Sequence, residues 1–491
     1  MFKNMTPETA GISSEKVLEF FKTIDSANLT THSVIMAKGD NIVTECYYEP
    51  FHKDYMHRMY SVSKSFIAIA IGLAYTKGLL SLDDKVMDYF PELKADNPND
   101  YAMDVTIRDM LTMTTNCCGG FSWYQNCESR LKAYFSMKTA NKLPGTLFFY
   151  DSIGSYILNC IVEKITGKEF LEYLKENVLL EIGFSKESYT LYAPGEYTIG
   201  DSGIMCSARD LLLFTRFVAK YGEWNGKQYI DREFMKQAVT KQVHNDIVNG
   251  VNYYGSHGYG YLIWCMPNGG FSLVGMGDQL AVYDRNTDFT FVITSDNQAD
   301  SATARTIIFH EVYKTLINNI AEEPLPENVK AYNELCDYTE NRKLVSQQGN
   351  ICSSISQAID KEEYILEQNG MNLENFTLEF KENGGVFNFK KDGNEYKLPF
   401  GLCENIFGDF PENRRQLLSM GDIGEGYYKC ATSGAWVMEN HFVIKSQITD
   451  TYFGCLNIHF VFKENTVQLL MKKSGQFVLD GFEGYANGIR K

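Results

Sequence analysis

Residues 59–75 read MYSVSKSFIAIAIGLAY, the most apolar helical run in this chain. Ser61 and Lys64 stand three residues apart at its start, so a helix places both side chains on one face. Burial at the head of so apolar a segment disfavours the charged form of a lysine. A neutral or poised lysine can help remove the proton of a neighbouring serine hydroxyl and so activate a nucleophile. The alternative is a helix N-terminus with capping serines and a solvent-facing lysine.

Length, charge and composition narrow the class of protein. A chain of 491 residues is too long for one ordinary core and indicates two or three domains. The net charge of −16 disfavours binding to nucleic acid or to anionic membranes. Residues 1–8 lack the apolar core of a signal peptide, and no stretch reaches the roughly 18 apolar residues of a membrane span. With twelve scattered cysteines, these features predict reduced thiols and a cytoplasmic location.

Strand patterns occur at both ends of the first 320 residues, and helical patterns fill the middle. The expected strands cover residues 34–38, 41–47, 259–266, 271–276, 279–283 and 289–294. A helix over 304–320 is expected to close this region. The economical fold is of the α+β class, with one antiparallel sheet made by both ends of the region and a helical lobe inserted between them.

A Pro- and Glu-rich stretch, Glu322-Glu323-Pro324-Leu325-Pro326-Glu327, indicates a linker. Beyond about residue 370 the sequence alternates like a strand protein, which predicts a small antiparallel sheet or barrel. The predicted organisation is therefore a first domain at 1–322, a linker at 323–332 and a C-terminal β-rich domain at 333–491.

Other chemistries have weaker support. Gly200-Asp201-Ser202-Gly203 is similar to the nucleophile motif of chymotrypsin-like proteases, but those need a histidine base and a buried aspartate in a double β-barrel. The surroundings here are helical, so we expect a glycine turn. The cluster Cys117, Cys118 and Cys127 lacks paired C-x-x-C spacing, so no zinc site is predicted. His257 is expected to be a solvated loop residue.

A second motif strengthens the hypothesis that the serine–lysine pair is catalytic. Tyr150-Asp151-Ser152 precedes a helical pattern, and a tyrosine near a lysine ammonium can relay protons. In these two places the chain resembles the serine hydrolases related to class C β-lactamases and penicillin-binding proteins. Residues 59–66 are similar to the family's S-x-x-K motif, and Tyr150-Asp151-Ser152 is similar to its Y-x-N/S motif. The resemblance extends over roughly residues 10–320 through the connecting segments 78–86, 90–92, 105–112 and 207–212.

The resemblance implies a β-lactamase/transpeptidase-like fold and roles for several residues. Ser61 is the expected nucleophile, and Lys64 and Tyr150 share the removal of its proton. Ser152 is expected to hold the lysine–tyrosine network or the substrate. The backbone N–H groups of Ser61 and Gln279 are expected to form the oxyanion hole. Neither a metal nor an organic cofactor is implied.

The third family motif is altered in this chain. Residues 274–280, VGMGDQL, resemble the G-H-G-G-Q variant of the K-T-G strand, with Met276 in place of Lys or His and Asp278 in place of the final Gly. The predicted substrate-binding residues are Ser152, Met276, Gly277 and Asp278. Losing a charge-assisted hydrogen bond to a substrate carboxylate forfeits about 1.5–3 kcal/mol. The resemblance and this departure together predict weak or no β-lactamase activity, and Asp278 could also alter the path of the strand or repel an anion.

The leading hypothesis is a serine hydrolase that acts on an ester or amide through an acyl-enzyme. One alternative is a low-turnover or inactive penicillin-binding or sensor-like protein; others, within the enzymes, are a D-aminopeptidase and a β-lactamase. The expected partner is a small-molecule ester, amide or peptide substrate, without nucleic acid or membrane. The oligomeric state stays open.

Overall fold

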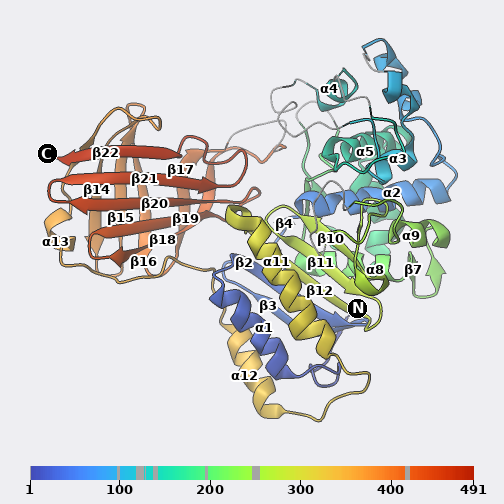
Figure 1. Ribbon diagram of the computed structural model, residues 1–491, viewed down its shortest axis with the longest axis horizontal. Helices are drawn as coiled ribbons and strands as arrows, with labels where there is room; N and C mark the ends of the chain where they lie inside the picture. Colours follow the sequence, from blue (N-terminus) through green and yellow to red (C-terminus); the bar gives the residue numbers. More distant parts are fainter. Residues whose placement is uncertain are drawn as a thin grey trace. The chain divides into compact units, whose positions relative to one another are not determined.

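The computed structural model describes residues 2–96, 100–117, 127, 129–136, 142–193, 197–245, 255–414 and 421–491. It divides into two compact units (Figure 1). The first comprises Met1–Asn297, Ser301–Lys343 and Leu417–Asp422, and the second comprises Gln298–Asp300, Leu344–Gln416 and Ile423–Lys491. The main division thus falls after Lys343, beyond the linker expected at 323–332.

In the described residues, the first unit is built on a seven-stranded sheet in the order β1-β3-β2-β12-β11-β10-β9. Its strands are β1 (Lys3–Asn4), β2 (Thr31–Lys38), β3 (Asn41–Tyr47), β9 (Trp264–Cys265), β10 (Phe271–Gly275), β11 (Gln279–Asp284) and β12 (Phe289–Ser295). Apart from the parallel β1–β3 pair, neighbouring strands are antiparallel. Because β2 pairs with β12, strands from both ends of the unit form one sheet, which confirms the predicted α+β fold.

Both faces of this sheet are covered. Helices α1 (Ser14–Ser26) and α11 (Ser301–Glu311) lie over one face, as Figure 1 shows, and α8 (Ala208–Ala219) packs on β2, β11 and β12 from the other. Successive side chains of a strand point to opposite faces. In β2, Val34 therefore joins the core beneath α1, and Ile35 joins the core shared with α8.

The apolar run found in the sequence forms the central helix α2 (Ser63–Thr76), which is buried from Ser63 to Ala74. It packs against α5 (Ser152–Thr166) and α6 (Phe170–Leu174) in the helical lobe. Gly72 lets α9 (Arg232–Ala238) approach, because a Cβ there would lie 2.4 Å from the ring of Phe234. Other short helices and strands among the described residues of this unit include β4 (His57–Arg58), α3 (Ile107–Leu111), α4 (Arg130–Ser136), α7 (Leu180–Ile182), β5 (Tyr189–Thr190), β6 (Ile204–Cys206), β7 (Glu223–Trp224) and β8 (Lys227–Gln228).

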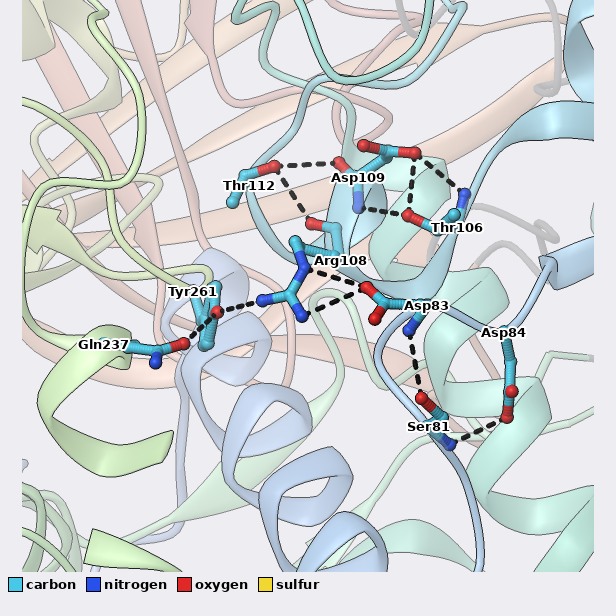
Figure 2. Close-up of polar contacts among 9 residues, drawn as sticks. All are labelled: Ser81, Asp83, Asp84, Thr106, Arg108, Asp109, Thr112, Gln237 and Tyr261. Carbon is cyan, nitrogen blue, oxygen red and sulfur yellow. Dashed lines mark hydrogen bonds and ion pairs between the residues drawn. The ribbon is translucent and has the colours of Figure 1, made fainter. Parts of the chain in front are cut away.

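The segment expected to be a strand at 259–266 is a strand only at Trp264–Cys265. Leu262 adopts a left-handed φ of 53°, and its N–H donates to the Leu111 carbonyl at 2.8 Å. The hydroxyl of Tyr261 accepts from Arg108 at 2.9 Å and donates to Gln237 at 2.7 Å, a network drawn in Figure 2. These contacts fold the segment into a turn against α3, so tertiary packing overrides its β-propensity.

The helix expected over 304–320 is regular only in α11, which ends at Glu311. A π-helical turn follows at Val312–Leu316, and a 3-10 turn at Ile317–Asn319.

Helix α12 (Val329–Glu340) explains why the first unit extends to Lys343. It packs on α1 and β3, and the Asp25 carboxylate of α1 accepts from the Tyr338 hydroxyl at 2.6 Å. The same carboxylate pairs with Arg342 at 3.1 Å. These contacts fasten the segment that follows residue 328 to the first unit.

The second unit is a β-barrel. Its strands are β13 (Tyr364–Leu366), β14 (Leu373–Lys381), β15 (Gly384–Lys391), β16 (Asn394–Leu402), β17 (Ile406–Asn413), β18 (Tyr427–Met438), β19 (His441–Ile448), β20 (Gly454–Lys463), β21 (Thr466–Ser474) and β22 (Gly484–Arg490), with the short helix α13 (Ser356–Ile359) before them. A parallel pairing of β16 with β18 closes the circuit, and β17 adds to β18 outside it. Buried rings such as Phe387, Phe460 and Trp436 belong to its core. The predicted C-terminal β-rich fold is confirmed.

Within the described residues, none of the helices is both long enough and apolar enough to cross a membrane.

Candidate active site

Ser61 and Lys64 are in contact at the start of α2. Ser61 lies in the 3-10 turn η1 (Tyr60–Val62), which leads directly into the helix. The Lys64 ammonium donates to the Ser61 hydroxyl oxygen at 2.9 Å. Lys64 is only 1% exposed, so the alternative of a solvent-facing lysine is wrong. The arrangement places a lysine nitrogen beside a serine nucleophile candidate in a buried setting.

The residue before Ser61 has an unusual backbone. Tyr60 has a φ of 46°, a left-handed conformation that costs a non-glycine residue about 1–2 kcal/mol. Its ring is buried, with the Arg58 guanidinium 5.1 Å from the ring centroid. Packing therefore holds a strained turn at the residue that presents Ser61, as strained residues at functional sites often do.

The Gly200–Gly203 segment lies against this turn. The Asp201 backbone carbonyl accepts a second hydrogen bond from Lys64 at 2.8 Å. Next to it, the Met59 N–H donates to the Ile204 carbonyl at 2.9 Å. The segment was expected to be a glycine turn without chemistry, so its contact with Lys64 is a feature that sequence reasoning missed.

The ring of Tyr150 lies near the Lys64 side chain. The Lys64 nitrogen lies 5.5 Å from the centroid of the Tyr150 ring, and that ring stacks on Trp264 at 5.9 Å with an interplanar angle of 17°. Asp151 caps α5 by accepting from the Gly154 N–H at 2.9 Å, and it also accepts from the Tyr134 hydroxyl at 3.0 Å. These bonds fix the loop that carries Tyr150.

Ser152 is the first residue of α5 and is 6% exposed. Its hydroxyl oxygen makes no hydrogen bond to any part of the chain that the structure describes. The hydroxyl thus keeps its hydrogen-bonding capacity for a ligand or for the lysine–tyrosine pair.

The altered third motif forms the turn between β10 and β11. Gly277 and Asp278 both have left-handed φ values, of 73° and 68°. Asp adopts this conformation more readily than most residues with a side chain. The Ser295 hydroxyl donates to the carbonyls of both residues, at 2.7 and 2.8 Å. Asp278 therefore keeps a conformation that glycine would adopt, and the hairpin stays intact.

The side chain of Asp278 has its own partner in the protein. It is fully buried, and its carboxylate accepts from Arg305 of α11 at 2.8 Å. Burial raises the pKa of Asp278, and the Arg305 charge lowers it. The carboxylate is thus compensated and enclosed, which differs from the expected repulsion of substrate anions. Arg305 is a cation near this motif that sequence reasoning missed. Met276 is half-buried at the turn.

The Gln279 side chain is occupied by structural contacts. Its amide nitrogen donates to the Met276 and Ser295 carbonyls at 2.9 and 2.7 Å. The turn η1 packs against β10 and β11, and a Cβ on Gly275 would lie 2.5 Å from the Met59 carbonyl oxygen. The strand end that carries Gln279 therefore abuts the segment that carries Ser61, which is the neighbourhood that an oxyanion hole requires.

The cysteine cluster and His257 are the remaining candidates from the sequence. Cys118 of the cysteine cluster lies outside the described residues, and His257 is half-buried in its loop. In the parts of the chain that are described, no three His, Cys, Asp or Glu side chains are grouped as a metal site needs.

Comparison with known proteins places the chain in a family. A family model described as Beta-lactamase matches residues 23–310, and the chain belongs to this family. Its curated relatives include an uncharacterized protein from Alkalihalophilus pseudofirmus, 26% identical over 258 residues that cover 47% of this chain and 71% of the relative. Another is the 6-aminohexanoate-dimer hydrolase of Paenarthrobacter ureafaciens, 22% identical over 281 residues, or 53% of this chain and 71% of that protein.

Solved structures agree on the fold. A putative beta-lactamase from Bacteroides dorei aligns with a TM-score of 0.51 at 19% identity, covering 61% of this chain and 98% of that one. A putative 6-aminohexanoate-dimer hydrolase from Bacillus anthracis aligns with a TM-score of 0.50 at 18% identity, covering 67% and 89%. The recognised family and the β-lactamase-like fold are thereby confirmed, and they make the chain a member of a hydrolase family.

Proposed function

We propose that this protein is a serine hydrolase that cleaves a neutral ester or amide through an acyl-enzyme on Ser61. The observation that carries the proposal is the 2.9 Å hydrogen bond between the Ser61 hydroxyl and a lysine that is 1% exposed. A lysine in this setting, close to a tyrosine ring, is suited to move protons to and from the serine.

In the proposed reaction, the Ser61 oxygen attacks the carbonyl carbon while its proton passes to the Lys64–Tyr150 pair. The N–H groups of Ser61 and Gln279 stabilise the oxyanion. Collapse of the tetrahedral intermediate breaks the bond to the leaving group, which takes a proton through Tyr150. Water then attacks the acyl-enzyme, and its proton returns to Ser61 by the same route. Lys64 and Tyr150 act as one coupled unit, so the base is the pair rather than either residue.

Three features support neutral substrates. Met276 offers no charge to a substrate carboxylate, and the nearby cation of Arg305 is bound by Asp278. The stacked rings of Tyr150 and Trp264 give the site an apolar wall beside Lys64. A relative named as a hydrolase of a 6-aminohexanoate dimer adds short linear amides to the compounds worth testing.

The test combines a fluorophosphonate probe with a chromogenic ester, p-nitrophenyl butyrate. The unmodified protein should be labelled once and should release p-nitrophenol with turnover, and Ser61→Ala should lose both. Ser26→Ala, an exposed serine at the end of α1, is the matched control and should retain both.

Persistent labelling of Ser61→Ala would refute the assignment of the nucleophile. Stoichiometric acylation without turnover would instead favour the sensor-like alternative. Cleavage of a chromogenic cephalosporin as fast as the best ester would refute the expectation of neutral substrates, and preferred cleavage of D-aminoacyl amides would make the enzyme a D-aminopeptidase.

A further inference from the structure

A buried ion pair involves Asp201, the residue whose backbone carbonyl accepts a hydrogen bond from Lys64. Arg130 of α4 donates to both carboxylate oxygens of Asp201 at 3.0 Å, and the two side chains are 1% and 4% exposed. The guanidinium carbon also lies 4.2 Å from the centroid of the Tyr156 ring. The backbone carbonyl of the same aspartate is the second acceptor of the Lys64 ammonium.

The pair needs an explanation beyond stability. Removing two charges from water carries a large desolvation penalty, and well-packed apolar side chains in the same place are often as stable or more stable. Accepting a hydrogen bond from Lys64 requires only a backbone carbonyl, which any residue supplies. The carboxylate of Asp201 must therefore contribute something that the carbonyl alone does not.

That contribution is the orientation of the peptide group. Arg130 holds the Asp201 side chain, and Arg58 donates to the carbonyl of the next residue, Ser202, at 3.0 Å. The N–H of Ile204 donates to the Ser63 hydroxyl at 3.2 Å. The segment from 201 to 204 is thus fixed at both ends, and its first carbonyl points at Lys64.

We infer that the Arg130–Asp201 pair is a positioning device for Lys64. It holds the carbonyl acceptor that keeps the lysine nitrogen beside the Ser61 hydroxyl. A lysine side chain has a flexible stem and three donors. With Ser61 and the Asp201 carbonyl engaging two of these donors, the nitrogen is held on the side of Tyr150. This inference rests on the proposed serine hydrolase function.

The pair also places two opposite buried charges on the residue that accepts from Lys64 and on its partner. Among the described residues, contacts connect Lys64 with two sets of charged or titratable groups: Tyr150, whose ring centroid lies 5.5 Å from the lysine nitrogen, and Asp201 with its partner Arg130. While the ion pair is intact, its two charges compensate each other. Removing only Arg130 leaves a buried anion that favours protonated Lys64, and removing only the Asp201 charge leaves a buried cation that favours neutral Lys64.

The experiment measures kcat/KM for p-nitrophenyl butyrate against pH in Arg130→Gln, Asp201→Asn and the double variant. We expect the acidic limb of the profile to move up by about one pH unit in Arg130→Gln and down by about one unit in Asp201→Asn. The acidic limb of the double variant should lie close to that of the unmodified protein. In each variant kcat should fall about tenfold with a smaller change in KM, because the damage is to orientation.

Arg216→Gln is the matched control. Arg216 is a buried arginine of α8 that pairs with the half-exposed Asp288 at 2.6 Å, so its loss tests the effect of removing a buried guanidinium from an ion pair elsewhere. Its acidic limb should stay in place. Arg130→Lys keeps the charge but loses the planar guanidinium that lies 4.2 Å from the Tyr156 ring centroid, so we expect a lower kcat with the limb unchanged. This variant preserves the test if Arg130→Gln fails to fold.

The outcomes separate the two proposals. If the unmodified protein neither labels at Ser61 nor cleaves esters, the proposed function fails. If it does both, but folded Arg130 and Asp201 variants keep the original limb and the original kcat, the positioning inference fails while the proposed function stands. Limb shifts of the same sign in both single variants would also overturn the inference.

Discussion

Acid should destabilise the first unit through a buried histidine pair near the Ser61 segment. His32 Nδ1 and His57 Nε2 lie 2.8 Å apart, and His57 Nδ1 lies 2.9 Å from the Arg58 carbonyl oxygen. The carbonyl must accept, so neutral His57 carries its proton on Nδ1 and accepts from His32 on Nε2. Burial lowers the pKa of His57 to about 3, and burial with the neighbouring imidazole holds the pKa of His32 well below its usual range.

The sign and size of the effect follow from these shifts. Both imidazoles are neutral in the folded state, but in the unfolded state each takes up a proton below about pH 6.5, so stability falls as the pH falls. Each unit of pH between 6.5 and the folded pKa removes about 1.4 kcal/mol per histidine. Between pH 7 and pH 5 the loss is therefore about 2 kcal/mol for His57, and His32 adds to the loss in the same direction.

The variant His57→Gln tests this account, since glutamine cannot titrate. We expect the loss of stability between pH 7 and pH 5 to shrink by about 2 kcal/mol. Urea unfolding followed by pulsed hydrogen exchange and mass spectrometry reads the first unit separately, through peptides from β2. His310→Gln, an exposed histidine on α11, should keep the original pH dependence. An unchanged pH dependence in His57→Gln would refute the reasoning.

Three further predictions follow from single contacts. Asp25→Asn removes the charge that holds Arg342, and we expect α12 to lose about 2–3 kcal/mol of local stability, measured by hydrogen exchange. Gly275→Ala places a Cβ 2.5 Å from the Met59 carbonyl oxygen, so the strand must shift, with a loss of about 1–3 kcal/mol in unfolding free energy and a fall in ester kcat. Asp278→Asn leaves the Arg305 cation uncompensated, and kcat/KM for a carboxylate-bearing ester should rise about tenfold relative to a neutral ester.

The second and third of these predictions each have a control variant. Gly408→Ala, in β17 of the second unit, adds a Cβ with no atom within 4 Å and should leave the ester kcat unchanged. Arg305→Gln should not gain activity on the charged ester, because the cation itself is gone. Unaltered exchange in α12 of Asp25→Asn, full activity of Gly275→Ala, or an unchanged substrate ratio in Asp278→Asn would contradict the respective account.

The parts of the site that could be predicted from the sequence are those set by local spacing. Ser61 and Lys64 are three residues apart where a 3-10 turn runs into a strongly apolar helix, so local helical geometry brings them together. The antiparallel sheet was predictable from local composition, because its strands are short runs rich in β-branched, aromatic and other apolar residues between turn residues. The order of the motifs along the chain then placed Tyr150, whose ring lies near Lys64.

What the sequence could not show depends on contacts between distant residues. Arg130 meets Asp201 across 71 positions, and neither residue belongs to a motif that signals the pair. The replacement of the family's glycine by Asp278 was visible in the sequence. Its partner Arg305, however, is 27 positions away on helix α11. The turn at Leu262 was read as a strand, because its β-branched and aromatic neighbours have strand propensity that tertiary packing overrides.

The central claim is that Ser61 carries the acyl group during turnover. The most direct measurement is mass spectrometry of the protein quenched in acid while it hydrolyses p-nitrophenyl butyrate. The account predicts one butyryl group on the peptide that contains Ser61, formed within the burst of p-nitrophenol release and absent from Ser61→Ala. Steady ester turnover with no acyl group on Ser61, or with the group on another residue, would contradict it.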